Sequence, residues 1–158
     1  PALTYLRSVN SLEAYEQGYI KIRYAPSDNR VLFYTPDELG AVGRALDKRT
    51  PKWWSYGDTS SGIHVGSGNH CILVEDAPSA CSVSRIEGYT GVALLGTNVT
   101  QPIRKTLSKY TSCGIVLDKD ASRKAVLLTR QNKCINYVRF TANDLKLLSA
   151  ESVRDLIQ

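Results

Sequence analysis

Apolar runs that end at carboxylates are the feature that most constrains how this chain can fold. Ile115–Leu117 stops at Asp118 and Asp120, and Leu73–Val74 stops at Glu75. Continuous apolar runs are typical of buried parallel strands, because helices cover both faces of such a sheet. Ligands of open α/β sheets bind outside the C-terminal ends of the strands, where these carboxylates would lie. Neighbouring carboxylates repel one another unless a cation neutralises them, and Mg²⁺ takes oxygen ligands. The sequence therefore predicts a magnesium site that binds a phosphate.

From residue 70 onward, strand-like and helix-like segments alternate. The expected strands are 71–74, 92–95, 115–118 and 134–140, and the expected helices are 80–86, 102–110, 122–131 and 150–157. Thr100 and Ser149 stand where side chains cap the N-termini of helices. Strands that alternate with helices of about ten residues form right-handed βαβ units. We therefore predict an α/β fold with a parallel sheet and flanking helices.

The first 56 residues have a different pattern. Residues 19–24 and 30–34 read as strands, and the turn-forming residues between them indicate a β-hairpin. Thr35, Pro36 and Glu38 form a capping box, which predicts a helix that continues through apolar residues as far as Leu46. A hairpin followed by a helix would make a small α+β subdomain over residues 1–56.

A Gly- and Ser-rich stretch separates the two patterns. Residues 57–69 contain Gly57, Gly62, Gly66 and Gly68 among several serines, a composition typical of a linker or loop. We therefore expect three parts: a basic α+β subdomain (1–56), a linker (57–69) and an α/β domain (70–158).

Composition narrows the classes of protein that fit. The net charge of +5 comes from 20 basic and 15 acidic residues and is compatible with nucleic acid as a partner. The four cysteines and two histidines lack zinc-finger spacing, so we expect reduced, buried thiols and a cytoplasmic protein. No run of about 18 apolar residues is present, and we expect no contact with a membrane.

The acidic segments resemble the motifs of the Toprim domain, a metal-binding fold of bacterial-type primases, topoisomerases and some nucleases. Leu73–Asp76 is similar to the family's Glu motif and Val116–Asp120 to its DxD motif, followed by the helix start Ala121–Ala125. Gly91–Asn98 looks like the strand between them, with Gly96 and Thr97 in its small-residue turn. Asn143–Ser149 is similar to an acidic segment of primases. The resemblance covers residues 70–158 well and residues 1–56 loosely.

The resemblance is to the bacterial-type (DnaG-like) primase core in particular. Val74–Asp76, with Ser79 and Ala80 close behind, looks most like the single-Toprim, primase-like proteins of tailed bacteriophages. A phage protein of this kind would act in the host cell's cytoplasm.

The resemblance implies a metal site and a catalytic role for the same carboxylates. Asp118, Asp120 and Asp144 would hold Mg²⁺ or Mn²⁺ and bridge nucleotide phosphates. Glu75 would complete the metal shell or act as general base on the attacking 3′-hydroxyl, and the sequence leaves both roles open. Asp76 has a simpler interpretation, since it stands where it can cap the next helix.

Basic and aromatic residues are the candidates for binding nucleotides or nucleic acid, because cations grip phosphates and rings stack on bases. The alternative for each one is a solvated surface position, or, for a tryptophan, a place in the core. The candidates are Lys21, Arg23, Lys52, Trp54, Arg123 and Lys124.

The function that the resemblance implies is primer synthesis: metal-dependent nucleotidyl transfer on a single-stranded DNA template. The implied partners are the template and nucleoside triphosphates, with a separate zinc-binding domain, a helicase or both. Two alternatives stay open. A Toprim nuclease would use the same carboxylates to activate water. A catalytically silent, primase-derived module would only bind nucleic acid or replication proteins, and Ser122, standing where many family members have glycine, is compatible with it.

A phosphoacceptor receiver domain fits less well. It would carry a lysine after its last strand, and Thr141 follows the expected strand 134–140 with no lysine beside it.

Overall fold

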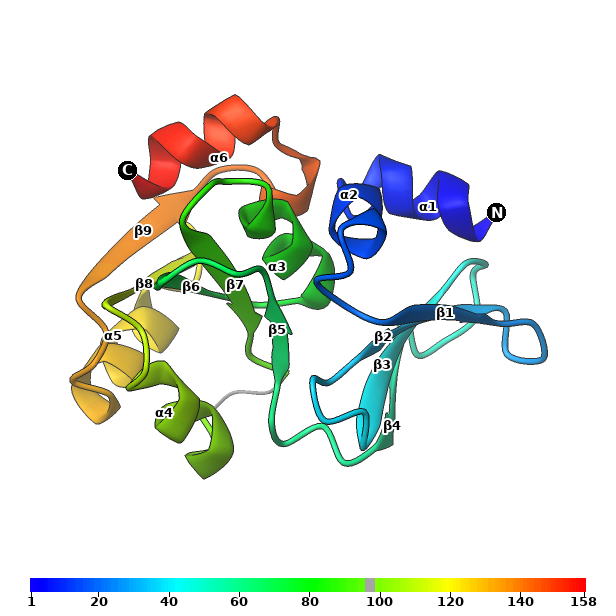
Figure 1. The fold of residues 1–158 in the computed structure, drawn as a ribbon, viewed down its shortest axis with the longest axis horizontal. Coiled ribbons are helices and arrows are strands. Elements are labelled where there is room, and N and C mark those ends of the chain that lie inside the picture. Colours follow the sequence, from blue (N-terminus) through cyan, green and yellow to red (C-terminus); the bar gives the residue numbers. More distant parts are fainter. Residues whose placement is uncertain (96–98) are drawn as a thin grey trace.

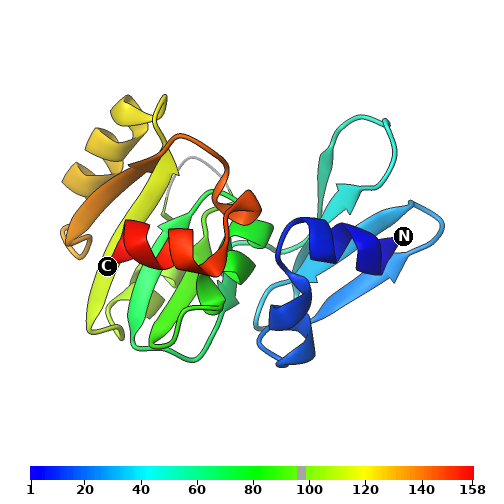
Figure 2. The ribbon, with the colours of Figure 1, turned by 90° about the horizontal axis from the view of Figure 1, so that it is seen from above.

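The computed structural model describes residues 1–95 and 99–158, which form two sheets that lie side by side (Figures 1 and 2). Two short helices precede the first sheet, whose four strands are all antiparallel, in the order β1-β2-β3-β4. The elements of this part are α1 (Ala2–Ser8), α2 (Leu12–Glu16), β1 (Ile22–Ala25), β2 (Arg30–Tyr34), β3 (Gly40–Ala45) and β4 (Trp53–Gly57).

The second sheet is mixed, with the order β5-β7-β6-β8-β9. β7, β6, β8 and β9 run parallel, and β5 pairs antiparallel with β7 at one edge. Its strands are β5 (Ile63–Val65), β6 (His70–Val74), β7 (Tyr89–Ala93), β8 (Ser112–Asp118) and β9 (Tyr137–Thr141). Its helices are α3 (Ala77–Ser84), α4 (Gln101–Leu107), α5 (Ser122–Gln131), η1 (Leu145–Leu147, a 3₁₀ turn) and α6 (Ala150–Ile157).

Helices cover both faces of the mixed sheet (Figure 1). Ile72 and Val74 of β6 pack in one buried cluster with residues of α3 and α6, whereas Cys71 and Leu73 pack in another with residues of α4 and α5. Alternate residues of a strand point to opposite faces, so the continuous apolar run of β6 serves both clusters. The predicted α/β class, a largely parallel sheet with flanking helices, is confirmed.

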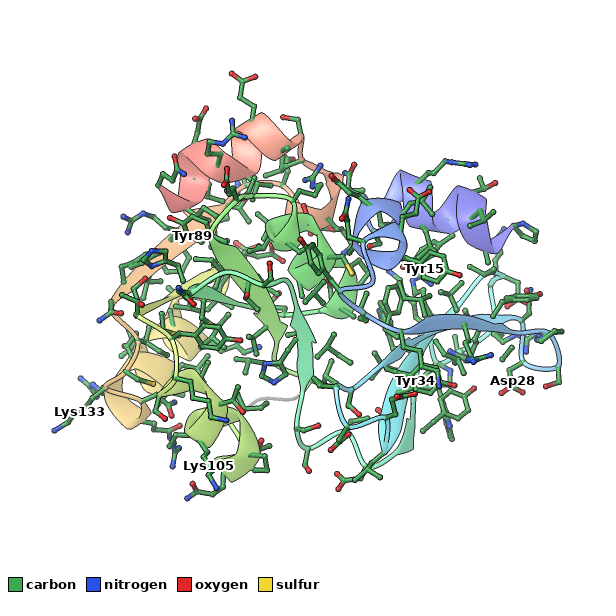
Figure 3. The ribbon with its side chains drawn as sticks, in the orientation of Figure 1. Tyr15, Asp28, Tyr34, Tyr89, Lys105 and Lys133 are labelled. Atoms are coloured by element: carbon green, nitrogen blue, oxygen red, sulfur yellow. The ribbon has the colours of Figure 1, made fainter. Side chains whose placement is uncertain are left out.

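The core under the mixed sheet continues into the antiparallel part. Leu6 of α1 and Phe33 of β2 are buried in the same cluster as Val74 and the helix α3. This shared core fixes the two sheets relative to each other. Tyr34 and Asp28 lie at the antiparallel end of the molecule and Lys105 and Lys133 at the opposite end (Figure 3).

The helix predicted from Pro36 to Leu46 is wrong. Thr35 does bind a carboxylate, but its hydroxyl donates to Asp37 at 2.6 Å inside a tight turn, and Glu38 has a left-handed φ of 60°. Residues 40–45 then form β3, hydrogen-bonded on both sides by β2 and β4. Pairing with two strands outweighs the local capping signal, so the α+β part is two helices and a four-stranded sheet.

Gly40 shows why this segment is a strand. A Cβ built there would lie only 2.3 Å from the carbonyl oxygen of Asp58, so glycine permits the close approach of the two backbones. The segment 57–69, predicted as a linker, contains β5 and thus adds a strand to the mixed sheet. The boundaries proposed for the three parts stay a prediction.

The elements after residue 70 match their predicted types. α5 and α6 have the predicted bounds, and Thr100 and Ser149 cap α4 and α6 with their hydroxyls. The cysteines are free thiols, and Cys71, Cys81 and Cys113 are buried. None of the described helices combines the length and apolar character that a membrane crossing needs.

Candidate functional site

The carboxylates that follow the parallel strands line one hollow at the edge of the mixed sheet. Glu75 follows β6, Asp118 ends β8 and Asp144 lies in the loop after β9. The C-terminal ends of parallel strands meet at one edge, as the pairing of Asp118 with Thr141 shows. The hollow has a volume of about 160 Å³ and is lined by Val74, Glu75, Asp76, Ser79, Val116, Leu117, Asp118, Thr141, Asp144, Leu145 and Lys146. We call it the acidic hollow.

Negative charge is concentrated in the acidic hollow. Partial burial raises the pKa of Asp118 above its ordinary value, and the carboxylates of Asp144, Asp76 and Asp120 raise it further, while Lys146 opposes them. A carboxyl group whose ionised form is disfavoured by its neighbours is stabilised by a cation brought close to it. The hollow thus has the donor type and the charge that suit a hard divalent metal ion.

Lys146 lies in the acidic hollow, although no sequence pattern singles it out. Its ammonium group is 3.0 Å from Oδ2 of Asp76 and 3.5 Å from Oδ2 of Asp144. Burial alone would lower the pKa of Lys146, but these two carboxylates outweigh burial and raise it. Lys146 is therefore a charged ammonium group that neutralises part of the hollow.

Asp76 caps α3, as predicted. Its Oδ1 accepts a hydrogen bond from the backbone N–H of Ser79 at 2.9 Å. Its other oxygen holds Lys146, so one carboxylate fixes both the start of α3 and the lysine in the hollow. The sequence predicted the cap and missed the second contact.

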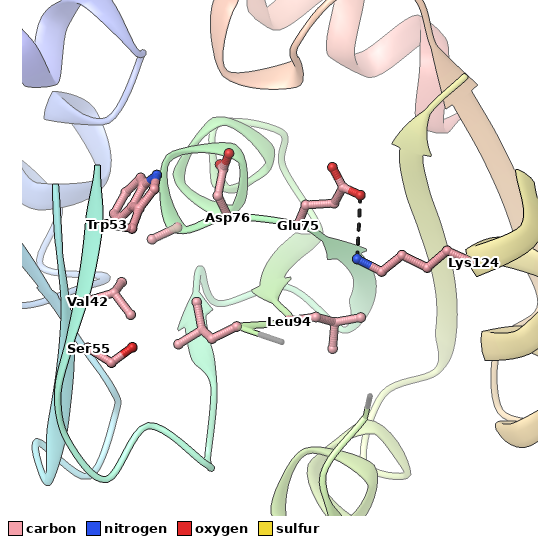
Figure 4. Close-up of a pocket in the computed structure, with 9 residues that line it drawn as sticks. Val42, Trp53, Ser55, Glu75, Asp76, Leu94 and Lys124 are labelled. Carbon is pink, nitrogen blue, oxygen red and sulfur yellow. Dashed lines mark ion pairs between the residues drawn. The ribbon is translucent and has the colours of Figure 1, made fainter. Parts of the chain in front are cut away.

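Glu75 is paired with Lys124 across the edge of the sheet. The Lys124 ammonium group, from the first turn of α5, lies 3.5 Å from Oε1 of Glu75 (Figure 4). Both side chains are partly exposed, so the pair is accessible to a ligand. Arg123, the neighbouring candidate, is exposed on α5.

Asp120 occupies a different place from the other predicted ligands. It is exposed in the turn after β8 and does not line the acidic hollow, although its charge acts on Asp118. Among the described residues, no group of three or more His, Cys, Asp or Glu side chains lies close enough together to hold a metal ion. Glu75, Asp118 and Asp144 therefore border the hollow without converging on one point. The predicted turn at Gly96 and Thr97 lies outside the described residues.

The candidates in the antiparallel part lie away from the acidic hollow. Register places Arg23 of β1 and Trp54 of β4 in one row across the sheet, with Leu32 and Gly43 between them, so the four share a face. Trp54 is 52% exposed, and we call this the outer face. The adjacent residue Trp53 points the other way, towards the mixed sheet.

Lys21 and Lys52 stand directly before β1 and β4, the two edge strands of the antiparallel sheet, and they have different partners. Lys21 binds Glu38 and lies over the ring of Tyr34, 4.6 Å from its centroid. Lys52 is exposed just before β4, and its carbonyl accepts a hydrogen bond from the buried Arg30. The structure thus places Glu75, Asp118 and Asp144 around the acidic hollow, with Lys124 beside Glu75. It leaves Lys21, Arg23, Lys52 and Trp54 in the antiparallel part.

Solved structures of primase domains have a fold similar to that of this chain. No family model and no curated protein matches the chain. Among solved structures, the RNA polymerase domain of Mycobacterium tuberculosis primase DnaG superposes with a TM-score of 0.66 at 15% identity, over 96% of this chain and 60% of that one. A DnaG primase catalytic domain bound to single-stranded DNA gives 0.61 at 16% identity, over 92% and 57%.

The Aquifex aeolicus primase, solved with its zinc-binding and RNA polymerase domains, gives a TM-score of 0.60 at 23% identity, over 98% of this chain and 47% of that one. The chain thus spans about half to three-fifths of the length of these structures. Both of its sheets have counterparts there, because the superpositions cover nearly the whole chain. The chain has the fold of the DnaG primase catalytic core.

Proposed function

We propose that this chain carries out metal-dependent nucleotidyl transfer on a single-stranded DNA template, as in the synthesis of RNA primers. The observation that carries the proposal is the acidic hollow, in which Glu75, Asp118 and Asp144 come from three neighbouring strand ends. The fold shared with primase catalytic cores supports it.

Asp118 and Asp144 would hold the metal ion, Mg²⁺ or Mn²⁺, with Glu75 as a further ligand. Asp120, which lies outside the hollow, would act on the site through its charge. The metal would neutralise the charge on the nucleotide phosphates and on the transition state. In the reaction a 3′-hydroxyl attacks the α-phosphorus, the bond to pyrophosphate breaks, and the hydroxyl proton leaves to a base. Glu75 is the residue we propose for that proton when it is not a metal ligand.

The lysines would act on the phosphates. Lys124 lies beside Glu75, a residue that lines the hollow, and Lys146 itself lines the hollow. An ammonium group near a triphosphate stabilises the negative charge that moves to pyrophosphate as the bond breaks. Asp76 keeps Lys146 in place and caps α3, so we assign it a positioning role.

The biological setting that we propose is the replication of a tailed bacteriophage, in the cytoplasm of its host. The similarity of Val74–Asp76 and the residues behind it to phage primase-like proteins supports this setting. We propose a separate zinc-binding domain, a helicase or both as partners. A zinc-binding domain accompanies the RNA polymerase domain in the Aquifex aeolicus structure.

A second candidate function is a nucleic-acid-binding module without catalysis. Two observations favour it: Lys146 already neutralises two carboxylates of the hollow, and Asp120 lies outside the hollow. In such a module the lysine would replace the metal, and the outer face would carry the binding.

The test is an incubation of the protein with ribonucleotides, single-stranded DNA and Mg²⁺ or Mn²⁺. Short RNA products that depend on the template, and that disappear in Asp118→Asn, would support primer synthesis. The matched control is Asp155→Asn, the same change at an exposed position of α6. Shortened DNA without RNA synthesis would favour a nuclease. Binding of DNA with neither product would favour the silent module.

A further inference from the structure

A second hollow lies between the two sheets, directly beside the acidic one. It has a volume of about 360 Å³, within the range of about 300–1,000 Å³ that is usual for small-molecule sites. Its lining is Val42, Trp53, Ser55, Glu75, Asp76, Ala77, Leu94, Leu95 and Lys124 (Figure 4). We call it the Trp53 hollow.

One wall of the Trp53 hollow is the inner face of the antiparallel sheet. Trp53 and Ser55 are alternate residues of β4, and Val42 of β3 pairs with Ser55, so all three point to the same side. The Trp53 indole packs against Phe33 with ring centroids 6.0 Å apart, which holds it in place. Leu94, after β7, adds to the apolar lining (Figure 4). The hollow therefore offers a fixed aromatic ring with apolar neighbours.

The far side of the Trp53 hollow is charged. The Glu75–Lys124 ion pair lies opposite Trp53, and Glu75 and Asp76 also line the acidic hollow (Figure 4). A ligand with a flat ring, hydroxyl groups and a phosphate chain would match this order of surfaces. The ring would meet the indole, the hydroxyls would meet Glu75, and the phosphates would continue past Lys124 into the acidic hollow.

We infer that the Trp53 hollow receives the nucleobase and ribose of a nucleoside triphosphate, with the base against Trp53. The inference rests on the proposed function, because it takes the acidic hollow as the place of the phosphates. Stacking on an aromatic ring accepts every base, since each has a π-face. Such a site therefore suits an enzyme in which the template selects the base.

Tryptophan fluorescence tests the inference in a chain that keeps the Trp53 indole. The chain has two tryptophans, so in Trp54→Phe the indole of Trp53 is the only one. We expect ATP with Mg²⁺ to change the fluorescence emission of Trp53. Excitation at the red edge of the indole band avoids absorption by adenine. Tripolyphosphate with Mg²⁺ should bind without that change. The control is Trp53→Phe, whose remaining Trp54 on the outer face should not respond to ATP.

Calorimetry supplies the second measurement. Trp53→Leu should weaken the binding of ATP by about fivefold or more, the usual effect of losing one base–aromatic stack, and should leave tripolyphosphate binding nearly unchanged. Tyr15→Leu, which removes an exposed aromatic ring from α2, should leave both affinities nearly unchanged.

The possible results separate the two proposals. If ATP and tripolyphosphate bind equally well and Trp53 does not respond, the base site is wrong and the phosphate site stands. If neither ligand binds, both are wrong. If Trp53 responds to an oligothymidylate single strand and not to ATP, the hollow holds a template base, and the inference is overturned.

Discussion

The ammonium group of Lys146 lies 3.0 Å from the carboxylate of Asp76, and this contact joins η1 to the start of α3. Because 70 residues separate the two in sequence, the contact exists only in the folded chain. It places a fixed positive charge in a hollow lined by carboxylates. Stability and metal binding should therefore be linked at this lysine.

Lys146→Met should destabilise the metal-free protein by about 1–3 kcal/mol, because Asp76, Asp144 and Asp118 would then repel one another without a cation between them. Saturating Mn²⁺ should recover part of the loss. Urea unfolding with and without Mn²⁺ measures both effects. Lys105→Met, at an exposed position of α4, is the control, and an equal loss in the two variants would contradict the account.

Asp76 should make two separable contributions to the free energy of unfolding, one through the cap of α3 and one through the ion pair with Lys146. Asp76→Asn keeps an oxygen to cap α3 and loses the ion pair with Lys146, whereas Asp76→Ala loses both. We expect Asp76→Ala to be less stable than Asp76→Asn by about 0.5–2 kcal/mol, the usual contribution of a cap. The measurement is the unfolding free energy of the two variants side by side. Equal stabilities would mean that the cap contributes nothing.

His64 should make the fold sensitive to mild acid. Burial lowers its pKa below the ordinary 6.5, which outweighs the opposite effect of the hydrogen bond from Nε2 to the Ser61 carbonyl, 2.7 Å long. The unfolded chain therefore takes up the proton at a higher pH than the folded one. The stability that the neutral His64 contributes is fully present above pH 6.5. It is lost as the pH falls towards the pKa that His64 has in the folded chain.

His64→Gln is the variant for this prediction, because the glutamine amide can still donate a hydrogen bond but does not titrate. Unfolding free energies measured across the mildly acidic range should vary less with pH in the variant than in the unchanged chain. Parallel curves would show that His64 is not responsible.

The outer face should bind single-stranded DNA. Arg23→Ala should weaken binding and reduce its dependence on salt, since one phosphate contact is lost. Trp54→Ala should weaken binding by about fivefold or more, through loss of a stacked base. Anisotropy of a labelled oligonucleotide measures both. Lys133→Ala changes a lysine at the opposite end of the molecule (Figure 3) and should have little effect; if it matches Arg23→Ala, the outer face is not the binding surface.

The sequence predicted the α/β part well because its signals are local and agree with one another. α5 and α6 have apolar positions at helical spacing, and a serine hydroxyl caps α6. The segment 36–46 failed because its local signal conflicts with its surroundings: a helix start at Thr35 and Pro36 gives way to pairing with two strands. No local pattern records which neighbours a segment will have.

The acidic hollow could be predicted in part from the sequence. The carboxylates at the ends of β6, β8 and β9 had to meet at one edge once the strands were parallel. Lys146 was not predictable, because its place depends on how η1 packs against α3. No strand was predicted over residues 53–57, so only the structure shows that Trp53 and Trp54 face opposite sides and that Trp53 lines a hollow.

Binding of Mn²⁺, followed by electron paramagnetic resonance, tests the central claim most directly, because free and bound Mn²⁺ give different spectra. We predict that the chain binds Mn²⁺, and that Asp118→Asn and Asp144→Asn each weaken binding by about tenfold or more, while Asp155→Asn leaves it unchanged. A chain that binds no Mn²⁺, or binds it equally well without the carboxylates of Asp118 and Asp144, would contradict the assignment of the acidic hollow as a metal site.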